Sequence, residues 1–400
     1  MSKEEYIISI NGGSSSIKFA LYKIEEQLIE VFHGEIENMG TQNAKISSTS
    51  SGTQQKKTVN IQSGDRDEAI RHFIDWLEKQ EGFDLVIAIG HRIVHGMKHI
   101  EPEIISPELI KELKEISAFD PEHLPEEIKL IEIFSKCYPS LKQIACFDTS
   151  FHTSMPTVAK LVAIPRRYYD KGIQRYGFHG LSYTYLLEEL KRVCGNETAK
   201  GKIILAHLGN GASLAAVKDG ISIDTSMGFT PTSGIPMGTR TGDLDPGVAW
   251  YLMEHEQLAP TQFNALINHE SGLLGISETS SDMRTLLEIE GTDERAREAI
   301  EMFCYQAKKC IGAYTAVLGG LDVLVFSGGI GEHSSEVRRR ICVNLGFLGI
   351  DMDEYKNRRN EFTVSTDTSN VKILVIRTNE EFIMAKMVRN VLISQNGIHE

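Results

Sequence analysis

The sequence is short of cysteine and of long apolar runs, and each shortage excludes a class of protein. Its 6 cysteines lie scattered over 400 residues without CxxC or metal-ligand spacing. This pattern predicts reduced, mostly buried thiols and no disulfide framework. No run approaches the roughly 20 apolar residues that cross a bilayer. The acidic N-terminus leads directly into an expected strand, unlike a signal peptide. We therefore expect a cytoplasmic protein without a membrane partner.

Basic charge is also in deficit. The chain carries 42 Lys and Arg against 55 Asp and Glu, a formal net charge of −13. Nucleic-acid binding needs basic patches, so we expect no nucleic-acid partner. An anionic small molecule stays possible, because a few local cations override the global field.

Three nucleotide or hydrolase motifs are missing. There is no GxxxxGK[ST] phosphate loop and no Gly-x-Ser-x-Gly elbow. The run Gly328-Gly329-Ile330-Gly331 resembles a dinucleotide fingerprint, but Ser334 stands where its third glycine would be. We expect this run to be a loop between a strand and a helix, either a structural turn or a phosphate contact.

What the chain does contain is a pair of similar glycine-hinged strand pairs. They cover residues 8–21 and 205–217, and alignment of Ser16 with Ser213 also places Gly12 on Gly209. Glycine turns let backbone N–H groups approach a phosphate closely. The similarity predicts a duplicated domain whose two hairpins face a nucleotide cleft.

The length and the order of elements predict two α/β lobes with mixed sheets. We place the first at residues 1–149, completed by a helix over about 380–400, and the second at 150–379. Helical spacing is clearest over 68–80, 295–318 and 380–393, and buried strands are expected over 85–89, 144–147, 322–326 and 371–376. The Gly/Thr/Pro-rich stretch 220–247 is expected to be one long loop.

Several charged residues follow short strands or lie in glycine-rich loops, namely Arg92, Asp148, Arg240 and Glu380. Ligands of α/β sheets sit beyond the carboxyl ends of strands, which favours a site for Arg92 and Asp148. For each residue a structural ion pair or helix cap is the alternative, and a structural role is also open for His179.

At these motifs the chain resembles the acetokinase family of the sugar kinase, actin and heat-shock-protein superfamily. The block Asp224-Thr225-Ser226-Met227-Gly228-Phe229-Thr230-Pro231, followed by Gly238-Thr239-Arg240, carries the resemblance most specifically. It implies two duplicated actin-like (ribonuclease H-like) lobes with the active site between them. It also implies reversible phosphoryl transfer from ATP to acetate, with Mg²⁺ (or Mn²⁺), in a homodimer.

The resemblance also implies roles by position. Asn11 and Glu380 match metal-associated residues, and Arg92, Val94, Phe178 and Pro231 match the substrate pocket. Asp148, His179 and Arg240 match the catalytic residues. The nucleotide-contacting set is Lys18, His207, Leu208, Gly209, Asn210, Gly211, Asp282, Met283, Arg284, Gly329, Ile330, Gly331, Glu332 and His333.

Elementary electrostatics fits those roles. Acetate and the γ-phosphate repel each other until cations screen them, and charge spreads over the equatorial oxygens in the transition state. Arg92 would hold the carboxylate, while His179 and Arg240 would neutralise the phosphoryl group. A carboxylate needs no base to attack, so Asp148 would position the metal or its waters.

The chain departs from the family at Glu122 and Leu124, where Leu and Asn are usual, and at His333, where Asn is usual. Glu122 pointing inward would repel a simple carboxylate; alternatively, Leu124 lines the pocket. Hence a kinase for propionate, butyrate or a polar-tailed acid is the first alternative. A catalytically inactive nucleotide-binding paralogue is the second.

Overall fold

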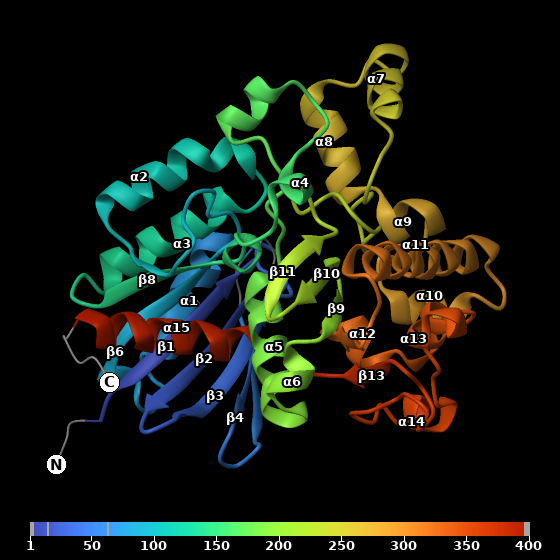
Figure 1. Ribbon diagram of the computed structural model, residues 1–400. Helices are drawn as coiled ribbons and strands as arrows, with labels where there is room; N and C mark the ends of the chain where they lie inside the picture. The colour runs from blue at the N-terminus through green and yellow to red at the C-terminus, as the bar shows by residue number, and fades with distance from the viewer. Residues whose placement is uncertain (1–3, 14–15, 62–63, 396–400) are drawn as a thin grey trace. The chain divides into compact units, whose positions relative to one another are not determined.

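The computed structural model describes residues 4–13, 16–61 and 64–395. It divides into two compact units, Met1–Ser150 with Asn379–Glu400, and Phe151–Thr378. Each unit is a mixed sheet covered by helices (Figure 1), which confirms the predicted α/β class. Ser14 and Ser15 of the first hairpin turn and residues 396–400 of the expected last helix lie outside the described residues.

The first unit is built on an eight-stranded sheet in the order β5-β4-β3-β2-β1-β6-β8-β7. Its strands are β1 (Tyr6–Gly12), β2 (Ile17–Ile24), β3 (Leu28–Glu37), β4 (Lys45–Ser50), β5 (Lys56–Asn60), β6 (Val86–Ile93), β7 (Glu103–Ile104) and β8 (Lys142–Phe147). The pairs β1–β6 and β6–β8 are parallel, and the other neighbours are antiparallel. Polar ends of β6 and β8 therefore emerge at the same edge.

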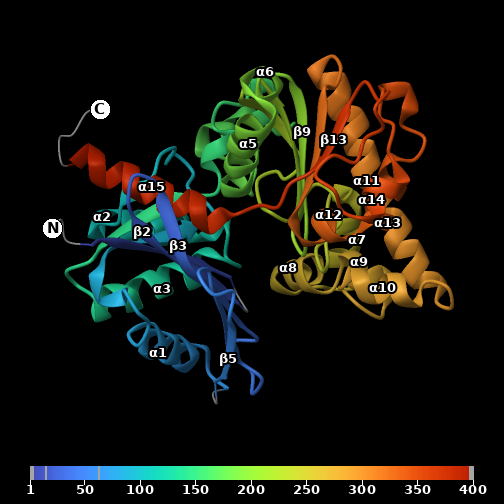
Figure 2. The ribbon, with the colours of Figure 1, turned by 90° about the horizontal axis from the view of Figure 1, so that it is seen from below.

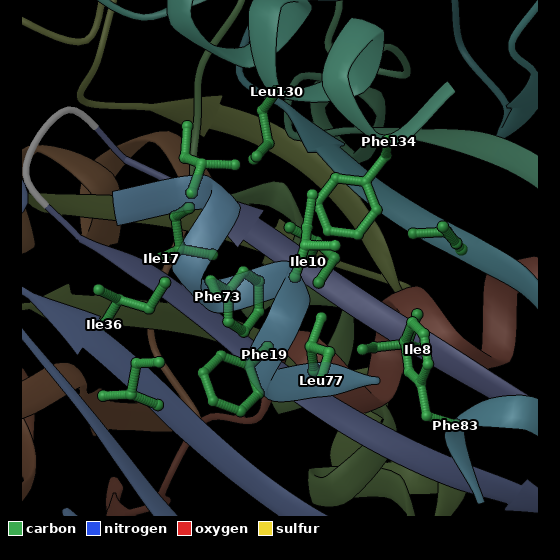
Figure 3. Packing of buried hydrophobic residues seen from close by; sticks show 14 of the residues in the cluster. Ile8, Ile10, Ile17, Phe19, Ile36, Phe73, Leu77, Phe83, Leu130 and Phe134 are labelled. Carbon is green, nitrogen blue, oxygen red and sulfur yellow. The ribbon is translucent and has the colours of Figure 1, made fainter. Parts of the chain in front are cut away.

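Helices cover both faces of this sheet, with α15 (Glu380–Gln395) on one side and α1 (Arg66–Leu77) and α3 (Leu124–Cys137) on the other (Figure 2). A further helix described in this unit is α2 (Pro107–Ile116). Successive side chains of β1 point to opposite faces of the sheet, which explains why each face has its own set of helices. Ile8 and Ile10 join the cluster of Phe73 and Phe134 (Figure 3), whereas Ser9 Oγ donates to the carbonyl of Glu381 on α15.

The second unit is built on a five-stranded sheet in the order β11-β10-β9-β12-β13. Its strands are β9 (Lys202–Leu208), β10 (Ala212–Lys218), β11 (Ile221–Thr225), β12 (Val323–Ser327) and β13 (Lys372–Val375). Helices α5 (Gly180–Cys194) and α11 (Glu294–Leu318) cover opposite faces (Figure 2). The other helices are α4 (Thr157–Lys160), α6 (Asn196–Ala199), α7 (Pro246–His255), α8 (Pro260–His269), α9 (Gly272–Ser277), α10 (Met283–Ile289), α12 (Gly328–His333), α13 (Ser335–Cys342) and α14 (Glu354–Arg358).

The two sheets repeat one arrangement of strands. The run β3-β2-β1-β6-β8 has the same order and the same strand directions as β11-β10-β9-β12-β13. In both, an antiparallel hairpin comes first and its first strand then pairs in parallel with the next. The glycine-hinged segments recognised in the sequence are these hairpins, β1–β2 and β9–β10.

Two expectations about loops are wrong. The stretch 220–247 contains β11, which pairs with β10 across a tight turn at Asp219 and Gly220, both with positive φ. Such a two-residue Asp-Gly turn is a hairpin signal that the sequence did offer. The run Gly328–Gly331 is not a loop but the start of α12, because the Glu332 carboxylate reaches back and accepts from the Gly328 N–H at 2.9 Å.

The expected strand at 85–89 is longer than predicted, since β6 continues through Ile93. Its polar residues are tolerated because they bond inside the unit: Nε2 of His91 lies 2.6 Å from Oε1 of Gln143. Burial lowers the pKa of His91 to about 4, so this imidazole stays neutral.

Cys146, Cys304 and Cys342 are buried, Cys194 and Cys310 are partly buried, and Cys137 is exposed. Burial raises the pKa of Cys146 and Cys342 to about 12, which keeps these thiols unreactive. Over the described parts of the chain, no helix combines the length and apolar character needed to cross a bilayer.

Candidate active site

The first cluster of predicted site residues joins the end of β1 to the start of α15. The Asn11 side-chain amide donates to Oε2 of Glu380 at 2.9 Å and to Oε1 of Glu381 at 3.3 Å. Partial burial, aided by the charge of Glu380, raises the pKa of Glu381. The structure thus brings together the two residues predicted to hold the metal, and adds Glu381.

Lys18 belongs to the same neighbourhood. Desolvation opposes its charge, but the carboxylates of Glu381, Glu380 and Glu35 outweigh that effect and raise the pKa of Lys18. The ammonium is therefore held in its charged form beside the acidic cluster, as a phosphate-binding group needs to be.

The donor set at Asn11 and Glu380 suits magnesium. Mg²⁺ in nucleotide sites binds one or two carboxylates and completes its shell with phosphate oxygens and water. No group of three or more His, Cys, Asp and Glu that could enclose a metal is found in the described residues. A carboxylate and an amide oxygen are both ligand types that Mg²⁺ accepts.

The second cluster lies at the ends of β6 and β8. Nη2 of Arg92 donates to Oδ2 of Asp148 at 2.8 Å, and the Asp148 side chain is wholly buried while that of Arg92 is 16% exposed. Arg92 Nε finds no hydrogen-bond partner among the described residues. The guanidinium is anchored by Asp148 and keeps a donor to spare, which a substrate carboxylate could use.

Glu127, on α3, also faces Arg92, and sequence reasoning missed it. Its Oε1 lies 3.9 Å from Nη1 of Arg92, and its Oε2 accepts the Val94 N–H at 2.9 Å. Burial raises the pKa of Glu127 to about 8, although Arg92 and the Val94 N–H oppose this. The one available signal was helical spacing, which places Glu127 on the buried face of α3 with Leu124 and Leu130.

The residues proposed as apolar walls are all buried in their own units, Val94 in the first and Phe178 and Pro231 in the second. Leu124 is fully buried against Ile93 and Phe147, next to the Arg92–Asp148 pair. Glu122 is only partly buried. Leu124 thus belongs to the core beneath the ends of β6 and β8, while the role of Glu122 stays a prediction.

In the second unit the two predicted transition-state residues converge on one glycine. A Cβ atom at Gly211 would lie 3.2 Å from Nε2 of His179 and 3.7 Å from Nη1 of Arg240. His179 adopts a left-handed conformation, φ 59°, just before α5. Arg240 is fixed by donation from Nη1 to the Pro231 carbonyl at 3.2 Å. Two nitrogen donors therefore border a bare stretch of backbone.

The nucleotide segments predicted in this unit adjoin that glycine. Gly238 N donates to the Asn210 carbonyl at 3.2 Å, and a Cβ at Gly238 would lie 3.3 Å from the carbonyl of Ser281, the residue before Asp282. A Cβ at Gly209 would lie 3.7 Å from the Gly329 N. The segments 207–211, 281–282 and 329 are thus adjacent.

Not every member of the predicted nucleotide set points its side chain outward. Asp282 caps α10 by accepting the N–H groups of Arg284 and Thr285, and Met283 is buried. The Glu332 carboxylate is taken up by backbone N–H groups of Gly328 and Thr378. These three side chains act locally, so their segments can offer a nucleotide mainly backbone groups, with Arg284 and His333 exposed beside them.

Arg338, absent from the sequence predictions, holds α12 in place. Its guanidinium is fully buried and donates to the carbonyls of Gly331 and Glu332 at 2.8 and 3.0 Å. It also bonds Asn357 and Asn360. Burial lowers the pKa of Arg338 to about 10. A buried cation held by carbonyl and amide oxygens fixes the helix that carries Gly329.

Together these clusters define a class. Two mixed sheets of the same strand order carry a carboxylate–amide pair, an arginine bonded to an aspartate, and a histidine–arginine pair beside a glycine. This set of residues is typical of a phosphotransferase that acts on small anionic substrates. Comparison with known proteins then names the family. Residues 6–386 match the model of the Acetokinase family, and the chain belongs to it, as the sequence predicted.

Relatives match over nearly their full length. The chain is 41% identical to an acetate kinase of Rickettsia felis over 391 residues, 97% of this chain and 100% of the relative. It is 41% identical to an acetate kinase of Halothermothrix orenii, over 95% of this chain and 98% of the relative. Among solved structures, a propionate kinase from Francisella tularensis matches with a TM-score of 0.89 and 35% identity, over 96% of this chain and 99% of that one. An acetate kinase of Porphyromonas gingivalis matches with a TM-score of 0.85 and 35% identity, over 97% and 100%.

Proposed function

We propose that the protein is an acetate kinase, which transfers the γ-phosphoryl group of ATP reversibly and directly to the carboxylate of acetate. The observation that carries the proposal is the convergence of His179 and Arg240 on Gly211. Phosphoryl transfer requires donors that neutralise equatorial oxygens without a side chain in the way, and this arrangement supplies them. Full-length similarity to relatives named acetate kinase supports it.

Each cluster then has a task. Arg92, anchored on Asp148, binds the acid carboxylate, and Val94 offers an apolar contact beside it. His179 and Arg240 stabilise the phosphoryl group in flight. Lys18 and the segments around Gly209, Asp282 and Gly329 bind the nucleotide.

Asn11 and Glu380 are the residues that would hold Mg²⁺. When bound, the ion neutralises charge on the β- and γ-phosphates. Asp148 forms an ion pair with Arg92. It is not needed as a base, because the acetate carboxylate is already the nucleophile. We assign it to anchoring Arg92 and to positioning water around the metal.

For the identity of the acid substrate, specific observations favour a second candidate. A similar solved structure is named a propionate kinase, and Glu122 replaces an apolar pocket residue by the family resemblance. Acyl phosphate formation, trapped as the hydroxamate, should be compared for acetate, propionate, butyrate and glycolate at fixed ATP and Mg²⁺. Acetate should give the highest kcat/KM. Loss of turnover with every acid would instead favour the inactive nucleotide-binding paralogue.

We further propose a homodimer formed through α7. This helix has no buried residue, and it exposes Val248, Trp250 and Tyr251 by 40, 63 and 52%. Large apolar side chains exposed on one helix favour a protein partner, and a second copy fits the family resemblance. Light scattering should give the mass of a dimer for the wild type and the mass of a monomer for Trp250→Glu.

We also propose that the protein works in the cytoplasm, where ATP for this reaction is available.

A further inference from the structure

The surroundings of Arg92 contain more negative charge than a carboxylate-binding site can easily tolerate. Asp148 pairs with Nη2 and Glu127 faces Nη1, and their side chains are 0% and 3% exposed. With both carboxyl groups ionised, one guanidinium faces two buried anions, and a bound substrate carboxylate would be the third. Like charges at such distances repel each other strongly in a poorly solvated site.

Of the two carboxylates beside Arg92, Glu127 is the one that can be neutralised by protonation. Asp148 has a hydrogen-bonded ion pair with Arg92 at 2.8 Å, whereas the 3.9 Å between Glu127 Oε1 and Nη1 is too long for a hydrogen bond. That Oε1 has no hydrogen-bond partner among the described residues. A buried carboxylate oxygen without a donor is poorly stabilised as an anion.

The other charged groups around Glu127 reinforce this imbalance. Asp120, at the entry to α3, and Asp148, at the end of β8, both disfavour a negative charge on Glu127, and only Arg92 of β6 favours it. Nδ1 of His123 lies 2.9 Å from Oδ1 of Asp120, so protonated His123 would compensate Asp120 rather than Glu127. Glu380 acts on Arg92 from α15 and competes for the same cation.

We propose that Glu127 makes acid binding proton-coupled: the substrate carboxylate binds Arg92 only when Glu127 carries a proton, which it takes from solvent and returns when the product leaves. This inference deepens the proposed function and rests on the assignment of Arg92 to the substrate carboxylate. Glu127 acts through Arg92 and is a positioning residue. Its protonated form keeps the bond from the Val94 N–H to Oε2, so the geometry of the loop after β6 is the same in both states.

The test is the pH dependence of KM for acetate between pH 6 and pH 9. Because burial places the pKa of Glu127 at about 8, KM of the wild type should rise about tenfold from pH 7 to pH 9, while KM for ATP should not follow it. Glu127→Gln, which resembles the protonated form, should stay within about twofold over the same range. Glu126→Gln, at the partly exposed neighbour paired with Arg66, should keep the wild-type profile. A flat wild-type profile, or the same rise in Glu127→Gln, would overturn the inference.

A binding measurement separates this inference from the proposed function. Calorimetric titration of wild type with acetate at pH 8, in two buffers of different ionisation enthalpy, should show uptake of about half a proton per site. Absence of proton uptake overturns the inference even if acetate is phosphorylated. Proton uptake without acyl phosphate formation keeps the inference and contradicts the proposed reaction. The wild-type measurement also stands if Glu127→Gln does not fold.

Discussion

The imidazole rings of His179 and His207 are stacked, with 4.3 Å between centroids and 24° between planes. A serine oxygen lies against each ring: Ser213 Oγ is 2.8 Å from Nδ1 of His179, and Ser182 Oγ is 2.8 Å from Nδ1 of His207. Ser213 thereby orients His179 with its Nε2 toward Gly211. The proposed transition-state contact thus depends on a residue that lies on β10, away from the loop before α5.

Removing that serine tests whether orientation matters. Ser213→Ala should lower kcat about fivefold with little change in KM, because a lost orienting hydrogen bond is worth about 1 kcal/mol in the transition state. Tyr183→Phe is the comparison variant, since the Tyr183 hydroxyl hydrogen-bonds the same Ser213 Oγ. It should keep kcat within about twofold. Equal losses in both variants would show that only packing is affected.

We expect the Arg240 guanidinium to stabilise the transition state more than the Ser213–His179 hydrogen bond does. Arg240→Ala should lower kcat at least about 100-fold while the melting temperature changes little, because one preorganised donor is worth about 3 kcal/mol in the transition state. Arg192→Ala serves as the control, as this arginine pairs with Glu189 on the exposed side of α5. Near-normal turnover of Arg240→Ala would remove Arg240 from the mechanism.

Magnesium dependence tests the assignment of Glu380. Glu380→Gln should raise the Mg²⁺ concentration for half-maximal velocity at least about tenfold, because a carboxylate is replaced by a neutral amide at the cation. Glu381→Gln, which changes a neighbour of Asn11 and of Lys18, should shift it less than about threefold. The initial velocity is measured after EDTA treatment and titration with Mg²⁺. The opposite ranking of the two variants would assign the metal to Glu381.

The pH dependence of stability tests the state of Glu127 without any substrate. An unfolded Glu titrates near pH 4.5 and the folded Glu127 near pH 8, so between these values the folded state holds a proton that the unfolded chain has released. Raising pH through this window therefore destabilises the wild type, whereas Glu127→Gln has no such proton. Urea unfolding at pH 5, 7 and 9 should show the variant gaining at least about 1 kcal/mol over wild type. Parallel curves would mean that Glu127 is ionised in the folded protein throughout.

Sequence patterns predicted the parts of the molecule that depend on local regularity. Apolar strands with glycine hinges predicted the hairpins β1–β2 and β9–β10, and helical spacing predicted α1 and α11 to within a few residues. The family resemblance supplied Arg92, Asp148, His179 and Arg240, and the structure brings them together in two pairs, one in each unit.

What sequence could not provide is burial of polar groups by distant segments. Glu127 looks like any charged residue of an amphipathic helix until α3 packs on β6 and places it beside Arg92. Arg338 looks like its neighbours Arg339 and Arg340, which pair with Glu336 at the surface, until α14 closes over it with Asn357. Glu332 appears to be a ligand residue, yet its carboxylate accepts from the backbone N–H groups of Gly328 and of the distant Thr378.

The central claim is the reaction itself, and the most direct measurement is acyl phosphate formation by the purified protein with ATP and Mg²⁺ over the panel of short acids. The account predicts hydroxamate from acetate with the highest kcat/KM of the panel, propionate next, and the reverse reaction from acetyl phosphate and ADP. A preference for glycolate, or no acyl phosphate from any acid while ATP still binds, would contradict it.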